Sequence, residues 1–324
     1  MKAWQILQGD CLDEMEWMAN ESVQCCVTSP PYFGLRDYGH AGQIGLETSP
    51  AEYVHRLVDV FREVRRVLKP DGTLWLNLGD SYNGYMANQR GTGLETKRQQ
   101  ARKYIEPGAG LRTDTMKNKD LMGIPWRVAF ALQEDGWYLR QDIIWHKPNP
   151  MPESVRDRCT KAHEYIFLFS KSPKYYFDIE AMKEPAVGAN LHDATGRTKQ
   201  RGLRDTFKRD DSKRAQVIPG QSAGTHRPDR DDNQYDLFTR NRRSVWTVPT
   251  RPFKGAHFAV YPPKLIEPCI LAGSRVGDVL FDPFAGSGTT GVVAVTHGRK
   301  AIMCELNAEY VELIKARMAQ AEEL

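Results

Sequence analysis

The sequence lacks the features that would place the chain in a membrane or around a metal ion. No uninterrupted apolar run approaches the ~18 residues of a membrane-spanning helix, and the start, MKAWQILQGD, reaches Asp10 before an apolar signal core could form. None of the six cysteines stands in a CxxC pair or at zinc-finger spacing from a histidine, so we expect no metal site. We therefore expect a cytoplasmic protein without membrane contact, whose cysteines are buried thiols.

Neither sign of charge dominates the composition. The chain has 45 basic and 41 acidic residues, and with 40% hydrophobic and 27% charged residues it is typical of a folded globular protein. Basic residues are concentrated instead in two polar segments, residues 83–120 and residues 183–243, and between Arg197 and Arg214 eight basic residues stand against three acidic ones. One such run by itself is most simply a solvated loop, but two in one chain favour contact with nucleic acid.

Outside these segments, patterns of strands and helices alternate. The apolar residues of 51–68 recur at helical spacing, whereas 23–28 is a compact apolar run, as in a strand buried on both faces. This alternation predicts an α/β fold with a doubly wound, mostly parallel sheet. The predicted strands are 4–8, 23–28, 73–78, 138–145, 165–169, 279–281 and 301–304, and the predicted helices are 11–18, 51–68, 126–133, 263–271, 289–297 and 308–318.

A glycine-rich loop follows the predicted strand 279–281, with the sequence Phe281-Asp282-Pro283-Phe284-Ala285-Gly286-Ser287-Gly288-Thr289-Thr290. Its glycines let the backbone turn tightly in front of the amides of a helix N-terminus. The loop has neither the lysine of a phosphate-binding P-loop nor the GxGxxG spacing, which favours a ligand without phosphates. Glu305 stands 19 residues after Gly286, at the end of the next predicted strand, where related folds place an acid that binds ribose hydroxyls.

A second motif, Ser29-Pro30-Pro31-Tyr32, follows the buried strand 23–28. Taken alone it is an ordinary rigid turn, but the ends of such strands bind ligands in open α/β sheets. Prolines remove amide donors, which leaves the Ser29 hydroxyl and backbone carbonyls as acceptors beside an aromatic ring. Such a site can hold an amino group on a flat ring.

The two motifs together resemble the S-adenosylmethionine-dependent DNA amino-methyltransferases of the permuted β group, in which the Ser-Pro-Pro-Tyr-type motif precedes the FxGxG motif. The resemblance also covers Gly9-Asp10-Cys11, Ile144 to Asn149, Ala162 to Lys171 and His257-Phe258-Ala259. It implies a Rossmann-like methyltransferase fold with circularly permuted motif order, in a bacterial or phage-infected bacterial cell. The implied division is a catalytic half (1–182), a target-recognition region (183–243) and a cofactor-binding half (244–324), with 83–120 a basic insertion.

The resemblance also implies which residues hold S-adenosylmethionine. Glu305 would bind the ribose, Asp10 would face the adenine, and Asp282 would lie near the amino group of the cofactor. The other implied residues belong to the glycine loop around the methionine moiety and to a variable flanking segment: Phe284, Ala285, Gly286, Ser287, Gly288 and Thr289 in the loop, and His257 and Phe258 in the flank.

The implied reaction is methylation of a base flipped out of double-stranded DNA. Tyr32 would stack on the base, and Ser29 with the Pro30 carbonyl would accept hydrogen bonds from its exocyclic amino group, so that the nitrogen attacks the methyl group directly and in line. In this family Ser at the first position goes mostly with cytosine N4 and Asp with adenine N6, so we expect cytosine N4, with adenine N6 as the alternative. Pro268-Cys269 could suggest cytosine C5 chemistry, but it falls inside a predicted helix.

Other functions stay open at this stage. An RNA or small-molecule methyltransferase is disfavoured by the motif order and the basic insertions, and an inactive DNA-binding protein by the intact motifs. A cognate restriction endonuclease is a partner that the resemblance allows, and family members occur as monomers and as homodimers.

Deletion of residues 90–118 should weaken DNA binding and leave S-adenosylmethionine binding intact, because the insertion begins soon after the predicted strand 73–78 and carries mainly basic charge. A salt titration of DNA affinity measures this. An unchanged affinity and salt dependence would contradict it.

Overall fold

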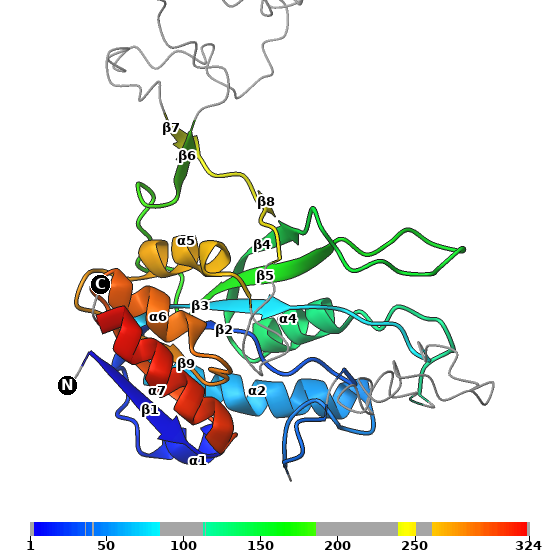
Figure 1. The fold of residues 1–324 in the computed structure, drawn as a ribbon, viewed down its shortest axis with the longest axis horizontal. Helices are drawn as coiled ribbons and strands as arrows, with labels where there is room; N and C mark the ends of the chain where they lie inside the picture. Colours follow the sequence, from blue (N-terminus) through cyan, green and yellow to red (C-terminus); the bar gives the residue numbers. More distant parts are fainter. Residues whose placement is uncertain are drawn as a thin grey trace, which may run out of the picture. The chain divides into compact units, whose positions relative to one another are not determined.

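A computed structural model of the chain divides into two compact units, one formed by Met1–Met182 together with Arg243–Leu324 and the other by Lys183–Arg242. The first unit consists of three layers, a central sheet with helices on both faces (Figure 1). The structure describes residues 3–35, 37–40, 42–84, 113, 115–185, 239–250 and 261–322.

The sheet of the first unit has eight strands in the order β1-β10-β9-β2-β3-β5-β4-β8. Neighbouring strands are parallel except at β5, which runs antiparallel to both β3 and β4. The predicted doubly wound, mostly parallel sheet is therefore confirmed, although the sequence indicated neither the reversal of β5 nor the short edge strand β8. The strands are β1 (Trp4–Gln8), β2 (Val23–Thr28), β3 (Leu68–Leu78), β4 (Tyr138–His146), β5 (His163–Ser170), β8 (Val245–Thr247), β9 (Val279–Asp282) and β10 (Lys300–Glu305).

Helices cover the two faces of the sheet in separate groups. The first three helices pack in one hydrophobic cluster and the last three in the other. Each lies where the apolar periodicity predicted it, with ends shifted by about one helical turn at most. The helices are α1 (Cys11–Glu16), α2 (Pro50–Val67) and α4 (Ile124–Glu134) on one face, and α5 (Pro263–Gly273), α6 (Thr289–Thr296) and α7 (Ala308–Glu322) on the other.

Burial on both faces explains the composition of β2. Every residue of this strand is buried, because helices lie above and below it and because β3 and β9 flank it. Five of the six cysteines are buried, as expected, but Cys159 is exposed. Cys269 is buried inside α5, in agreement with the prediction that it lies on a helix.

Strands from the two ends of the sequence meet in the middle of the sheet. β9 pairs in parallel with β2, and Cys26 lies opposite Phe281. From β2 the chain continues through α2 to β3 on one side, and from β9 it continues through α6 to β10 on the other. The β2/β9 boundary is therefore the topological switch point, where open α/β sheets bind ligands beyond the carboxyl ends of their strands.

Residues near the two ends of the insertion that follows β3 are hydrogen-bonded to each other. The buried Asn83 side chain donates from Nδ2 to the Thr113 carbonyl (3.1 Å) and accepts from the Thr113 amide at Oδ1 (3.0 Å). It also donates to the carbonyls of Met116 (2.7 Å) and Lys117 (3.2 Å). A deletion of residues 90–112, instead of 90–118, therefore tests DNA binding while it keeps these hydrogen bonds of Asn83.

The second unit is described only at its two ends. β6 (Lys183–Pro185) pairs antiparallel with β7 (Thr239–Asn241), and Arg240 forms an ion pair of 2.9 Å with Glu184. Most of the predicted target-recognition region, residues 183–243, lies outside the described residues, as does most of the insertion 83–120.

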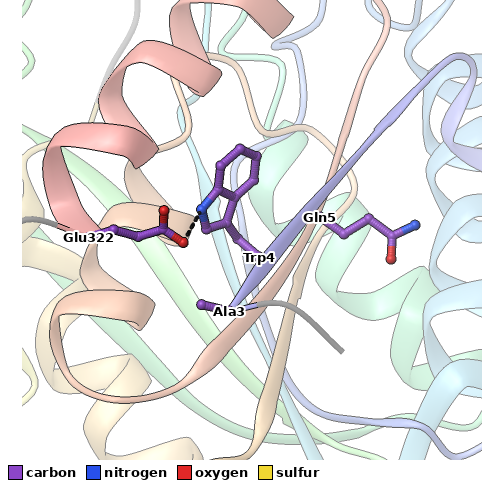
Figure 2. A pocket seen from close by; sticks show the side chains of 4 residues that line it. All are labelled: Ala3, Trp4, Gln5 and Glu322. Carbon is purple, nitrogen blue, oxygen red and sulfur yellow. Dashed lines mark hydrogen bonds between the residues drawn. The ribbon is translucent and has the colours of Figure 1, made fainter.

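A hollow at the edge of the sheet is lined by Ala3, Trp4, Gln5 and Glu322, and the Trp4 indole donates to Glu322 Oε1 (2.8 Å) (Figure 2). It lies at the beginning of β1, whereas the predicted site residues follow the strand ends. No predicted site residue lines it. Among the described residues, none of the helices combines the length and apolar character needed to cross a bilayer.

Candidate active site

The Ser-Pro-Pro-Tyr turn directly follows β2, and a side chain of α2 holds it in place. The Tyr53 hydroxyl of α2 donates to the Pro31 carbonyl (2.8 Å), and the Tyr53 ring packs against Phe33 with 5.5 Å between ring centroids. The two prolines restrict the backbone further because their φ angles are fixed. The turn is thus anchored before any substrate binds.

The Tyr32 side chain reaches from this turn to the end of β3 and the start of β5. Its hydroxyl lies 2.7 Å from Glu164 Oε2 and 3.3 Å from Asn77 Oδ1, and the Ser29 hydroxyl donates to it over 3.5 Å. Its ring lies against Gly79, where a Cβ atom would come within 2.5 Å of a ring carbon. Burial, reinforced by the charge of Glu164, raises the pKa of Tyr32 well above its ordinary value, so the hydroxyl stays protonated.

Glu164 is the acidic end of a polar cluster that the sequence did not assign to the site. Its second oxygen, Oε1, pairs with Lys147, whose ammonium lies 4.3 Å from the centre of the Trp145 ring. Asn77 Nδ2 donates to Glu164 Oε2 (3.3 Å) and to the Tyr165 carbonyl (3.0 Å). The sequence signals were Asn77, a polar residue within the apolar strand 73–78, and the family resemblance, which covers the stretches that contain Lys147 and Glu164 without assigning them a role.

Asp282, the last residue of β9, joins the two halves of the site. Its carboxylate is fully buried, and each oxygen accepts two hydrogen bonds. Oδ1 accepts from the Thr28 hydroxyl (2.6 Å) and the Phe284 amide (3.0 Å), while Oδ2 accepts from the hydroxyls of Thr290 (2.7 Å) and Tyr261 (3.1 Å). One carboxylate therefore ties the residue before Ser29 to both ends of the glycine loop, and burial raises its pKa.

The glycine loop connects β9 to α6 in a conformation that needs its glycines. Gly286 and Gly288 have φ angles of 54° and 75°, in the left-handed region that side chains other than glycine rarely adopt. A Cβ on Gly288 would also come within 2.9 Å of Ile314. The loop amide of Gly286 donates to Glu305 Oε2 (2.8 Å), and the Ala285 amide donates to the Cys304 carbonyl (2.9 Å), so that the loop lies against the end of β10.

Glu305 lies where the sequence placed it, at the end of β10 beside the loop. Its second oxygen accepts from the Asn307 amide (2.8 Å), and its carbonyl accepts from Gly9 (3.1 Å), which brings Asp10 alongside. Asp10 caps α1 by accepting from the Leu12 amide (2.8 Å). Burial raises the pKa of Glu305 to about 7, because it has few donors to offset the lost hydration.

Two loop residues predicted to bind the cofactor are held from α7. Arg317 donates to the carbonyl and hydroxyl of Ser287, the latter over 2.8 Å, and to the Thr289 hydroxyl (3.3 Å). Both side chains are buried, so they contribute to the shape of the loop. Phe284 is half-buried beside Asp282. His257 and Phe258 lie outside the described residues, and cofactor contact by each residue named above stays a prediction.

The arrangement fits an adenosine ligand that carries an amino-acid chain. The left-handed glycines let a ligand approach the backbone, the Glu305 carboxylate can accept from two hydroxyls, and Asp10 lies next to it along the same sheet edge. In the described part of the chain, no three His, Cys, Asp or Glu side chains are grouped so that they could hold a metal ion.

Comparison with known proteins defines the class. The family model described as DNA methylase, of the N6/N4 type, matches residues 23–316. The chain belongs to this family of S-adenosylmethionine-dependent DNA amino-methyltransferases, as the two motifs predicted.

The similarity to individual relatives covers nearly the whole chain. It is 46% identical to the Type II methyltransferase M.XycI of Xanthomonas campestris pv. cyanopsidis, covering 97% of this chain and 87% of the relative. It is 44% identical to the Type II methyltransferase M.SmaI of Serratia marcescens, covering 98% and 91%. In fold it is similar to the PvuII DNA methyltransferase (cytosine-N4-specific), with a TM-score of 0.60 and 19% identity over 99% of this chain and 90% of the other.

Replacement of Asp282 should separate its charge from its hydrogen bonds. Asp282→Ala leaves the Thr28 hydroxyl and the Phe284 amide without their acceptor, whereas Thr290 and Tyr261 can still bond to each other and Thr290 to the Val27 carbonyl. It should lower the free energy of unfolding by about 2–5 kcal/mol. Asp282→Asn should cost only about 1 kcal/mol, because its amide can donate to the oxygens of Thr290 and Tyr261, while its carbonyl still accepts from Thr28. Urea unfolding measures both, and equal losses would contradict this account.

Affinity for S-adenosylmethionine should fall as the pH is lowered through 7. The Glu305 pKa of about 7 means that the free carboxyl is ionised at pH 8 and mostly protonated at pH 6, where it accepts hydroxyl bonds poorly. If only the ionised form binds, the dissociation constant rises by up to about tenfold. Calorimetry on the wild type and on Glu305→Gln measures this, since the variant retains only the titration of the cofactor's own amino group. The same pH dependence in both proteins would refute the role of Glu305.

Proposed function

We propose that this protein methylates the N4 amino group of a cytosine flipped out of duplex DNA. The observation that carries the proposal is the position of Ser29, whose hydroxyl lies beside Tyr32 at the β2/β9 switch point, next to the glycine loop. Serine at this position goes mostly with cytosine in the family. Adenine N6 is the second candidate, because the family includes both kinds of enzyme.

The chemistry that the residues support is direct transfer. The exocyclic nitrogen is a poor nucleophile because its lone pair is delocalised into the ring. Hydrogen bonds from its protons to the Ser29 hydroxyl and the Pro30 carbonyl localise that lone pair, and the Tyr32 ring holds the base in the plane that points the nitrogen toward the cofactor. The bound cofactor would supply the electrophilic methyl group. As the bond from sulfur to the methyl group breaks and the new bond to nitrogen forms, the nitrogen gives up one of its two protons to water. Phe284, Gly286 and Glu305 would fix the cofactor's position.

The relatives support the same assignment and suggest its biological setting. M.XycI and M.SmaI are Type II methyltransferases by name, and the PvuII enzyme is cytosine-N4-specific by its title. A Type II enzyme of this kind protects a recognition sequence, so a restriction endonuclease with the same recognition sequence is the expected partner. We assign contact with DNA to the basic segments 83–120 and 183–243 because of their charge. In the first of these, Asn83 and Thr113 are hydrogen-bonded to each other.

The modified nucleoside tests the proposal. The protein incubated with unmethylated genomic DNA and labelled S-adenosylmethionine should yield N4-methylcytosine by mass spectrometry. Ser29→Ala should slow transfer about 100-fold, because it removes the acceptor for the amino group. Ser22→Ala is the matched control, since Ser22 lies just before the start of the same strand and its hydroxyl donates to the Ala19 carbonyl (2.7 Å), away from the site.

The other outcomes separate the alternatives. Detection of N6-methyladenine would show that adenine is the target base and would leave the class of enzyme unchanged. Transfer to RNA and not to duplex DNA would identify an RNA methyltransferase, and DNA binding without transfer to any substrate would identify an inactive DNA-binding protein.

A further inference from the structure

We propose that Glu164 sets the direction of a hydrogen-bond chain, Ser29 to Tyr32 to Glu164, and thereby makes the Ser29 hydroxyl an acceptor toward the target amino group. Glu164 is a positioning residue in this scheme, since it acts through Tyr32. The inference rests on the proposed function, which gives Ser29 its role.

The chain is defined by two contacts. The Tyr32 hydroxyl lies 2.7 Å from Glu164 Oε2, and the Ser29 hydroxyl lies 3.5 Å from the Tyr32 oxygen. Glu164 is 14% exposed at its side chain, and Lys147 compensates its charge on the side away from Tyr32. The carboxylate is therefore held between a cation and the tyrosine, with no need for solvent to stabilise it.

The number of protons available fixes the direction of the hydrogen bonds from Ser29 to Glu164. An ionised carboxylate only accepts, and Tyr32 has a single hydroxyl proton to donate. Two acceptors compete for it, Glu164 Oε2 at 2.7 Å and Asn77 Oδ1 at 3.3 Å, and the charged, nearer oxygen wins. The Tyr32 oxygen then presents its lone pairs to Ser29. The Ser29 proton points to Tyr32, and the lone pairs of Ser29 are left for the substrate.

This polarity matters for the reaction. A serine hydroxyl can donate as well as accept, and a bond donated to the amino nitrogen would occupy the lone pair that must attack the methyl group. An accepted bond has the opposite effect, because it draws on the N–H and leaves the lone pair free. Bonds in one direction along a chain polarise each other, so the carboxylate also makes Ser29 a stronger acceptor.

A purely structural role for the Glu164–Lys147 pair would be to hold β4 against β5. These strands are already paired along the length of β5, with Trp145 opposite Glu164 and His146 opposite His163. The ladder thus fixes the strands without the ion pair. Glu164 has one oxygen toward Lys147 and the other toward Tyr32 and Asn77. This position fits a role in the hydrogen-bond chain better than a role in holding the two strands together.

A double-mutant cycle tests the chain, with Tyr32→Phe, Glu164→Gln and the double variant assayed for methyl transfer to plasmid DNA with enzyme in excess. Tyr32→Phe keeps the stacking ring and removes the hydroxyl, whereas Glu164→Gln keeps the shape and removes the charge. Each single change should slow transfer about tenfold and leave S-adenosylmethionine affinity unchanged. The double variant should be no slower than Tyr32→Phe, since Glu164 then has nothing to act through.

Asp278→Asn is the matched control. Asp278 is also 14% exposed at its side chain and pairs with Lys69 over 3.1 Å. It lies just before β9, at the amino end of that strand, whereas the site lies at the carboxyl ends. It should lower stability in urea unfolding while the transfer rate stays at the wild-type value.

Several results would overturn the inference. A wild-type rate in Tyr32→Phe would do so, even if Glu164→Gln did not fold. So would a wild-type rate in Glu164→Gln, or a double variant in which the two losses multiply. Failure of the proposed function looks different, because Ser29→Ala would then transfer methyl groups at the wild-type rate, or the wild type would not methylate DNA.

Discussion

The site depends on one buried carboxylate. Asp282 ends β9 and accepts from Thr28 at the end of β2, so the residue before Ser29 and the glycine loop are bonded to the same carboxylate. A buried charge is stable only when its hydrogen bonds are complete, and here four donors converge on it. Any shift of the catalytic turn relative to the cofactor loop would break some of these bonds. The fold thereby holds the residues proposed to bind the target base in a fixed position relative to those proposed to bind the cofactor.

The two sides of Asp282 have different chemistry. Toward β10 lie the backbone amides of the loop and the Glu305 carboxylate, which suit hydroxyl groups on a ribose. Toward β3 and β5 lie the hydroxyls of Ser29 and Tyr32 backed by Glu164 and Lys147, which suit an amino group on a flat ring. Each side uses a carboxylate to orient neutral groups, and burial raises the pKa of the one beside the glycine loop, Glu305, to about 7.

The permuted order of the motifs has a simple physical basis. The proposed site requires that the ends of β2 and β9 be adjacent, and their adjacency comes from parallel pairing in the sheet. The chain can therefore begin at β1, next to β10, and still build the same edge, because the ends of all these strands meet there. The order of the two motifs in the sequence can therefore be exchanged without a change in the geometry of the site.

The sequence by itself determined the helices and most strands, since apolar periodicity follows directly from burial on one or two faces. It also determined the two motifs, because prolines and glycines restrict the backbone locally and need no partner to do so. Ser29, Tyr32 and Gly286 could be named from these motifs and the family they resemble, and Glu305 from its spacing after the glycine loop at a predicted strand end.

Only the tertiary structure decided the rest. The antiparallel course of β5 leaves no mark on its own residues, yet it brings Glu164 from the start of that strand to the ends of β2 and β3. Asp282 was identified as a cofactor neighbour, but its four donors come from segments as distant as Thr28 and Tyr261. Contacts of that kind depend on the packing of the sheet, and a one-dimensional pattern holds no record of which distant donor a buried acceptor will meet.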